Sequence, residues 1–218
     1  MIKAHQNKWA YRVFDIYLDR LLKSSFKEFY LVNDFPSLDA QKGLLVTANH
    51  FSWWDGFFVY YLLKKNTNKK VYVMMLEEQL KRYWFFAKLG CYSIDLQKAA
   101  STISTLRYTL DLLKDPGNSV LIFPQGEIEP YETRPIKFKG GIEFLIKHAK
   151  QDFQILNLAF KISYAEDKLP SVYALADKPL TSSLIIHHPH LHKESFNKNI
   201  LALDSDIRNN KKTNLFKK

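Results

Sequence analysis

The sequence predicts an α/β fold: a mostly parallel sheet covered by helices, in a single domain with an N-terminal amphipathic helix. Two observations lead to this prediction. The chain has 218 residues, 46% hydrophobic and 25% charged, which suits one domain with a real core and excludes a disordered composition. From residue 44 onward, apolar segments of strand length alternate with helical segments, as they do in parallel sheets. Apolar runs stay far below the roughly 18 residues of a membrane-spanning helix, so we expect none.

The first predicted element is a helix from Trp9 to Phe26. Its apolar residues recur at three- and four-residue steps, with charged residues mostly on the other side. This face either packs on the domain or lies in a membrane interface, which the mixture of Trp, Tyr and Lys/Arg favours. We therefore divide the chain into this helix (1–30), the main domain (31–210) and a basic tail (211–218).

The remaining elements alternate along the chain. Turn signals at "DFPS" and "QKG" precede a buried strand, and "DPGN" ends a later helix. Strands are predicted at 44–48, 71–75, 92–94, 119–123, 154–160 and 171–176, and helices at 53–65, 77–90, 98–114 and 140–150. In such sheets ligands bind outside the carboxyl ends of the strands. The segments "NHFSWWD" and "FPQGE" each follow a buried strand, so we expect them to meet at one edge of the sheet.

The composition also bears on location and partners. The formal net charge of +10 suits nucleic acid, anionic lipid or a phosphorylated ligand, but no nucleic-acid-binding motif is present, so we expect no nucleic acid partner. Five cations in "RNNKKTNLFKK" form either a solvated, frayed tail or a polybasic contact with anionic headgroups. A single cysteine, Cys91, and the lack of a signal peptide indicate the cytoplasm.

His50 and Asp55 are the first candidates for chemistry. They can meet only if His50 lies in the turn before the helix, because five residues along one helix would point them roughly 140° apart. An Asp bonded to imidazole Nδ1 fixes the tautomer and supports the imidazolium, which would make His50 a general base. The alternative is that Ser52 and Asp55 form a helix capping box and His50 is structural.

A second candidate segment is the loop from Pro124 to Lys139. Gly126 allows close approach of the backbone to a ligand, and free N–H groups at such a turn can bind an anion or oxyanion. Arg134, Lys137 and Lys139 supply cations nearby. The alternative is an ordinary surface loop with Pro and Gly punctuation.

Together these residues resemble the glycerolipid acyltransferase family, the lysophosphatidic-acid-acyltransferase-like enzymes. "NHFSWWD" is similar to the family's first motif, Asn-His-x-Ser-x-x-Asp, at every fixed position. "GCYSID" resembles the second motif, "FPQGE" the third, and "QILNLAF" falls where the fourth is expected. "FKGG" is similar to the Phe-Lys-x-Gly that follows the third motif. The motifs occur in order between residues 44 and 160.

Four positions depart from the family pattern. Gln125 replaces the usual Glu, Glu127 and Ile128 stand where Thr-Arg is expected, and Leu96 replaces an Arg. Since the family uses these positions around a phosphate-bearing acceptor, the resemblance supports acyl transfer better than it supports a glycerol-phosphate acceptor. Arg134 is the residue that would restore a phosphate contact.

The resemblance implies a mechanism. His50 takes a proton from an acceptor hydroxyl, which attacks the thioester of acyl-CoA or acyl carrier protein, while Asp55 orients His50. Backbone donors near Gly126 would hold the oxyanion. Neither a metal nor another cofactor is required. The expected substrate-binding residues are Asn49, Ser52, Phe123, Pro124, Gln125, Gly126, Glu127, Arg134, Lys137 and Lys139. A lysophospholipid-like acceptor is expected, and the protein would sit at the inner face of the cell membrane, on anionic lipid.

Other interpretations stay open. The acceptor could be a hydroxylated lipid or glycolipid without a phosphate. The same His–Asp pair could serve a hydrolase, or the domain could bind lipid without catalysis. The segment "HHPHLH" has the histidine density of a metal site, but an exposed strand end is the expected structure because no Cys lies nearby.

Overall fold

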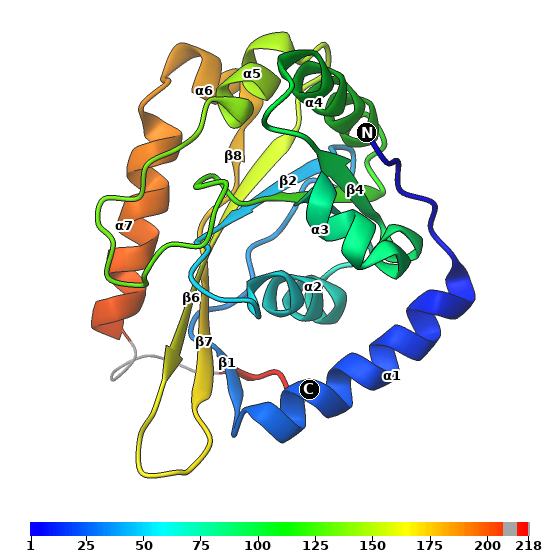
Figure 1. Cartoon of the computed structure of the whole chain (residues 1–218). Coiled ribbons are helices and arrows are strands. Elements are labelled where there is room, and N and C mark those ends of the chain that lie inside the picture. The colour runs from blue at the N-terminus through cyan, green and yellow to red at the C-terminus, as the bar shows by residue number, and fades with distance from the viewer. Residues whose placement is uncertain (207–212, 218) are drawn as a thin grey trace.

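The sheet is the framework of the molecule, and helices cover both of its faces (Figure 1). The computed structural model describes residues 1–206 and 213–217. Within them the sheet has nine strands in the order β4-β3-β5-β2-β6-β7-β1-β9, with β8 paired to β6. The strands are β1 (Phe29–Leu31), β2 (Leu44–Ala48), β3 (Lys70–Leu76), β4 (Cys91–Ile94), β5 (Asn118–Ile122), β6 (Gln154–Ser163), β7 (Ser171–Ala176), β8 (Leu180–Thr181) and β9 (Thr213–Asn214).

The predicted fold class is confirmed. Strands β4, β3, β5, β2 and β6 pair parallel in that order, and β7 pairs parallel with β1. Strand β6 pairs antiparallel with β7 and β8, and β1 pairs antiparallel with β9. The helices are α1 (Lys8–Ser25), α2 (Asp55–Asn66), α3 (Glu77–Arg82), the 3-10 helix η1 (Trp84–Leu89), α4 (Ala99–Leu113), α5 (Gly141–His148), α6 (Ser182–His187) and α7 (Leu191–Asp206). All six predicted strands are present.

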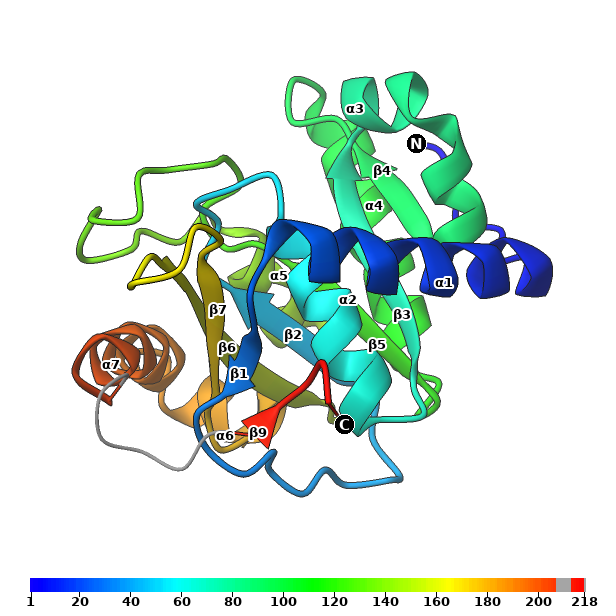
Figure 2. The same ribbon diagram turned by 90° about the horizontal axis from the view of Figure 1, so that it is seen from below.

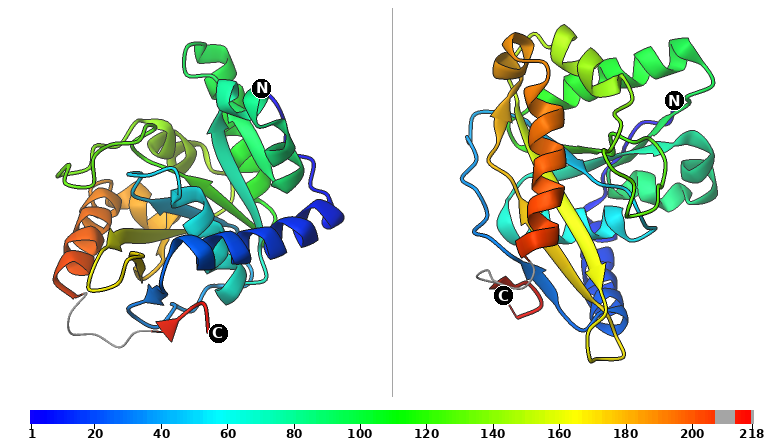
Figure 3. Two further views of the ribbon diagram at one scale, coloured as in Figure 1. Left: turned by 60° about the horizontal axis from the view of Figure 1, so that its bottom comes forward. Right: turned by 90° about the vertical axis from the view of Figure 1, so that its left-hand side faces the viewer.

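Alternation along the strands assigns the two faces. Leu44 and Val46 of β2 pack in the core that includes residues of α1 and α2, whereas Leu45 packs in the core formed with α4 and α5. Figure 2 shows α1 and α2 side by side on one face of the sheet. Helix α7 lies along β6 and β7 on the opposite face (Figure 3), where it buries Phe196 and Ile200. Both faces are therefore covered, as a mostly parallel sheet requires.

Helix α1 is packed on one side and exposed on the other. Leu18 and Leu22 are buried in the core, and Asp15 and Asp19 accept hydrogen bonds from Tyr60 and Tyr61 of α2 at 2.6 and 2.8 Å. The apolar side chains that face outward are Trp9, Val13, Ile16 and Tyr17, each more than half exposed. Packing on the domain thus uses only part of the helix's apolar surface.

The predicted helix at 77–90 is divided in two. Helix α3 ends at Arg82, Tyr83 leaves the helical conformation, and η1 continues to Leu89. Gly90 then takes φ 88°, and a Cβ there would lie 2.4 Å from the carbonyl oxygen of Val71. The chain turns sharply at this glycine because it must enter β4 beside β3.

Residues 213–217, part of the segment expected to be a basic tail, belong to the folded domain. β9 pairs with β1, Leu215 is fully buried, and Lys217 lies 3.6 Å from Glu28. The apolar pair Leu215 and Phe216 packs in the α1–α2 core, which holds the segment in place. The other expected cations, Arg208, Lys211, Lys212 and Lys218, lie outside the described residues.

The histidine-rich segment is not an exposed strand end. It joins α6 to α7, and His192 in the first turn of α7 is buried, with Nε2 2.9 Å from Asn157 Oδ1. Burial lowers the pKa of His192 to about 4, so it is neutral at physiological pH. The described part of the chain contains no group of three side chains placed to hold a metal ion.

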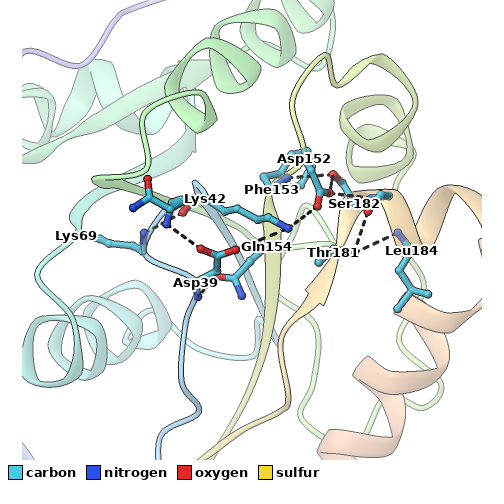
Figure 4. Close-up of polar contacts among 11 residues, drawn as sticks. Asp39, Lys42, Lys69, Asp152, Phe153, Gln154, Thr181, Ser182 and Leu184 are labelled. Carbon is cyan, nitrogen blue, oxygen red and sulfur yellow. Dashed lines mark hydrogen bonds and ion pairs between the residues drawn. The ribbon is translucent and has the colours of Figure 1, made fainter.

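A cluster of polar side chains lies at the amino ends of β2 and β6, away from the site described below (Figure 4). Lys42 Nζ lies 2.7 Å from Asp152 Oδ2, and Asp152 Oδ1 accepts a hydrogen bond from Ser182 Oγ at 2.7 Å. Gln154 Oε1 accepts a hydrogen bond from the Asp39 N–H at 2.8 Å. This cluster connects the loop before β2 with β6 and α6.

Candidate active site

The segments "NHFSWWD" and "FPQGE" meet at the carboxyl ends of the parallel strands, as expected. β2 and β5 are neighbours, with Thr47 opposite Ile122, so the residues that follow each strand emerge side by side. His50 follows β2, and the ring of Phe123, which follows β5, stacks on its imidazole at 4.0 Å between centroids. The sheet topology therefore places His50 against the loop that contains "FPQG".

His50 and Asp55 form the pair that the spacing predicted. His50 Nδ1 lies 2.8 Å from Asp55 Oδ2, and Asp55 is fully buried. His50 lies in the turn before α2, which begins at Asp55, so the five-residue separation does not force the side chains apart. Because Nδ1 is occupied, Nε2 is the nitrogen left for a substrate proton. The His50 side chain is 21% exposed and lines the large cavity beside it.

The capping interpretation is correct in part. Asp55 Oδ2 also accepts the N–H groups of Phe51 and Ser52, at 2.7 and 2.8 Å, and Ser52 Oγ donates to Asp55 Oδ1 at 2.6 Å. Ser52 Oγ accepts the Trp54 N–H at 3.2 Å. The Asp55 carboxylate thus has two roles: Oδ2 orients His50, and both oxygens hold the turn before α2. Helix α2 starts two residues later than predicted because residues 53 and 54 form part of this turn.

Asn49 contacts the backbone of β6. Its side chain is buried, donates to the carbonyl of Phe160 and accepts the Phe160 N–H, both at 2.8 Å. The residue therefore fastens the end of β2 to β6. This structural role replaces the substrate contact that we expected for Asn49.

Gly126 makes the sharp turn that its position predicted. It takes φ 72°, and a Cβ there would lie 2.7 Å from Lys139 Cδ. The Gly126 N–H donates to the carbonyl of Phe123 at 3.1 Å, so this group is used within the turn. Lys139 crosses over the turn, and its Nζ lies 2.9 Å from Glu127 Oε1. Pro124, Gly126, Glu127 and Lys139 all line the cavity.

Arg134 and Lys137 lie away from the cavity. The Arg134 guanidinium donates to the carbonyl oxygens of Tyr131 and Thr133, lies over the Tyr131 ring and is 3.6 Å from Asp204 of α7. Lys137 is exposed, and neither residue is among those that line the cavity. The structure therefore does not bring Arg134 to the position where it would contact a phosphate beside His50.

The cavity itself was not predicted. It has a volume of about 1000 Å³, at the upper end for ligand pockets, and extends from His50 between β3, β4, α4 and α5. Most of its lining is apolar, including Met75, Leu89, Ile94, Leu106 and Ile122. Leu96, Ile103 and Ile128 are exposed apolar residues on the same cavity. The apolar ends of β3 and β4 were the signal in the sequence that could have indicated it.

Comparison with known proteins identifies the family and the fold. The model of the family described as "Acyltransferase" matches residues 30–161, more than half of the chain. The protein therefore belongs to the acyltransferase family. The fold is similar to that of the 1-acyl-sn-glycerophosphate (LPA) acyltransferase PlsC from Thermotoga maritima, with a TM-score of 0.61. Sequence identity is 15%, over 89% of this chain and 80% of that one, so the likeness concerns the fold. No curated protein matches the sequence.

Proposed function

We propose that this acyltransferase moves a fatty acyl group from an acyl thioester, acyl-CoA or acyl carrier protein, to a hydroxyl group of a lipid. The observation that carries the proposal is the His50–Asp55 pair at 2.8 Å on the wall of a large apolar cavity. The pair supplies a general base, and the cavity supplies room for an acyl chain. A metal or further cofactor has no part in the proposed reaction.

The proposed reaction has two steps. His50 Nε2 takes the proton of the acceptor hydroxyl as its oxygen attacks the thioester carbonyl, and Asp55 stabilises the imidazolium that forms. The tetrahedral intermediate then collapses, the carbon–sulfur bond breaks, and the leaving thiolate receives the proton from His50. The products are an ester and a free thiol, and the imidazole returns to its neutral form.

The oxyanion of the intermediate needs a hydrogen-bond donor. Because the Gly126 N–H is used within its turn, we assign this role to the next N–H in the chain, that of Glu127. One such donor is worth about 2.7–4 kcal/mol in enzymes that have been tested by mutation. Because Gly126 has a positive φ, the peptide that follows it turns out of the direction that an extended strand would take.

Three observations favour an acceptor without a phosphate next to its hydroxyl over the lysophospholipid expected from the sequence. Arg134 is held by Tyr131, Thr133 and Asp204, outside the cavity. Lys139 lies at the cavity but pairs with Glu127, whose carboxylate would repel a phosphate. Ile128 and Leu96 offer apolar contacts there. A hydroxylated lipid or glycolipid is therefore our first candidate, and lysophosphatidic acid the second.

The deciding experiment supplies purified protein with acyl-CoA or acyl carrier protein and identifies products by mass spectrometry. The acceptors are lysophosphatidic acid and an uncharged hydroxylated lipid, each given to the wild type and to Arg134→Ala. We expect transfer to the uncharged lipid and no specific loss of transfer in the variant. Efficient transfer to lysophosphatidic acid that collapses in Arg134→Ala would overturn this choice of acceptor, and no transfer with any thioester would overturn the function.

We also propose that the protein works at an anionic membrane surface. The outward face of α1 carries Trp9, Val13, Ile16 and Tyr17 together with the basic Lys8, Arg12 and Arg20. Aromatic contacts continue from Phe14 of α1 to Phe57 of α2 and Phe86 of η1, both of which line the cavity. No helix within residues 1–206 and 213–217 is long and apolar enough to span a membrane. Peripheral binding would bring a lipid acceptor to the cavity.

A further inference from the structure

The backbone of His50 is held by Gln125, in addition to the contacts that Asp55 makes. Gln125 Oε1 accepts the His50 N–H at 2.6 Å, and Gln125 Nε2 donates to the His50 carbonyl at 3.2 Å. The Glu129 N–H donates to the same carbonyl at 3.0 Å. Gln125 is 4% exposed and is not among the residues that line the cavity. Its side chain therefore contacts the base residue's backbone and not a substrate.

A second contact fixes the chemical identity of residue 125. Gln125 Nε2 also donates to Glu129 Oε2 at 2.6 Å. Two groups that face this side chain, the His50 carbonyl and the Glu129 carboxylate, can only accept, whereas the His50 N–H can only donate. An amide satisfies all three at once. A carboxylate at position 125 would meet the Glu129 carboxylate at hydrogen-bond distance, where the two repel unless a proton is held between them.

We propose that Gln125 is a positioning residue for His50, and that Glu129 is the reason why an amide stands at position 125. The proposal rests on the proposed function, because His50 must be the base for its position to matter. Asp55 fixes the imidazole through Nδ1, Phe123 fixes the plane of the ring, and Gln125 fixes the peptide that carries them. The amide of Gln125 is then matched to the carboxylate of Glu129.

The pair can be tested by exchanging its two chemical groups. In Gln125→Glu the carboxylates clash, and in Glu129→Gln two amides face each other. In the double variant Gln125→Glu/Glu129→Gln, the new amide at 129 donates to the new carboxylate at 125, which still accepts the His50 N–H. The His50 carbonyl still accepts the backbone N–H of residue 129. Glu132→Gln, an exposed position in the same loop, is the matched control for loss of one charge.

We expect Gln125→Glu to lower kcat by about tenfold or more, since small displacements of a base are costly, with little change in the KM for the acyl thioester. The double variant should recover to within about threefold of the wild type, as expected for directly coupled residues. Glu132→Gln should behave as the wild type. Melting temperatures of all variants establish which of them are folded.

Two results would overturn the proposal. One is a folded Gln125→Glu variant with wild-type kcat, and the other is a folded double variant no faster than Gln125→Glu. The NMR shifts of the His50 backbone amide give a readout that needs no substrate: they should move in Gln125→Glu and return in the double variant. If the wild type transfers no acyl group, the proposed function fails, while this NMR comparison still decides whether the pair holds His50.

Discussion

Every group around the Asp55 carboxylate is a hydrogen-bond donor: the His50 imidazole, two backbone N–H groups and the Ser52 hydroxyl. A carboxylate can accept from all of them, because it offers about four lone-pair sites. An asparagine offers one acceptor oxygen in place of two, so its NH₂ group faces either the Ser52 hydroxyl, which donates here, or the side shared by the imidazole and the two backbone N–H groups. Orientation of the base and stability of the turn therefore depend on the same two oxygens.

We predict that Asp55→Asn lowers kcat by about two to four orders of magnitude through a wrong imidazole tautomer. Its melting temperature should also fall, because a buried donor loses its acceptor. Ser52→Ala, which removes only the contact to Oδ1 and the Trp54 contact, should cost less than about tenfold in kcat. Steady-state kinetics measure kcat, and thermal unfolding measures the melting temperature, for both variants. If Asp55→Asn keeps its rate and only its stability falls, Asp55 is a capping residue and not an orienting one.

The sequence allowed the His50–Asp55 contact to be predicted because the partners lie within one turn. The contacts of Gln125 and Arg134 could not be predicted in this way. Gln125 bonds a residue 75 positions away, and Arg134 meets Asp204 on α7, for which no helix was predicted. Lone polar residues in a loop carry no periodic signal that would identify partners so distant. Both were expected to bind the substrate, whereas the side chains of both contact the protein itself.

At the scale of elements, Gly90 is a tightly constrained junction between η1 and β4. The left-handed conformation and the nearby Val71 carbonyl leave no room for a side chain between η1 and β4. We predict that Gly90→Ala lowers the free energy of unfolding by more than about 2 kcal/mol, from backbone strain and steric overlap together. Denaturant unfolding measures this loss.

Gly56→Ala is the matched control for Gly90→Ala. Gly56 lies in α2, and a Cβ there would have no neighbour within 4 Å. Alanine is favoured over glycine in a helix by about 1 kcal/mol, so this variant should be as stable as the wild type or more stable. Equal stability losses in the two variants would contradict the structure at Gly90.

The Lys42–Asp152 pair predicts how stability depends on acid. Burial opposes the charged carboxylate of Asp152, but hydrogen bonds from Lys42, Ser182 and the Ser183 N–H outweigh it and hold the pKa at about 2. Since the ordinary value is about 3.9, the pair stabilises the fold fully above pH 4 and loses this contribution as pH falls towards 2. Asp152→Asn should be less stable at pH 7 by at most about 2 kcal/mol, and its stability should change less than the wild type's from pH 4 to pH 2. If the stabilities of the wild type and Asp152→Asn depend on pH identically, the Lys42–Asp152 contact is contradicted.

Element prediction was good where the pattern was long. The buried strands and the helices at 55–66 and 99–113 were found within a few residues. β1, β8 and β9 were missed, because two or three residues show no alternation. Helix α7 was missed although Phe196, Ile200 and Leu203, which pack on β6 and β7, follow helical spacing. The split between α3 and η1 was also missed; the carbonyls of Ala87 and Lys88 in η1 accept hydrogen bonds from the N-terminal segment, a contact too distant in sequence to be predicted.

At the scale of the whole molecule, the exposed face of α1 predicts peripheral membrane binding. We expect the protein to float with anionic vesicles and to detach as salt rises, since charge is screened within about 8 Å at physiological ionic strength. Trp9→Ser/Ile16→Ser should weaken binding by about tenfold or more, because burying each of these side chains is worth about 1.5–3 kcal/mol. Tyr164→Ser/Leu201→Ser removes two equally exposed apolar side chains elsewhere and is the control.

Two outcomes would contradict membrane binding through α1. Equal binding to neutral and anionic vesicles would exclude the electrostatic contribution. Equal loss of binding in the α1 variant and in the Tyr164/Leu201 control would show that no particular face docks. Because α1 is tied to α2 through Asp15 and Asp19, we expect the helix to bind as part of the folded domain.

The most direct test of the catalytic proposal is the rate of acyl transfer by His50→Ala, measured with the acyl thioester and acceptor that the wild type uses. His190→Ala, at an exposed histidine between α6 and α7, is the control. We predict that His50→Ala retains the wild-type melting temperature within a few degrees while kcat falls by about three orders of magnitude or more, through loss of general-base catalysis and positioning. His190→Ala should keep the wild-type rate. Turnover of the same substrates by His50→Ala at the wild-type rate would contradict the mechanism.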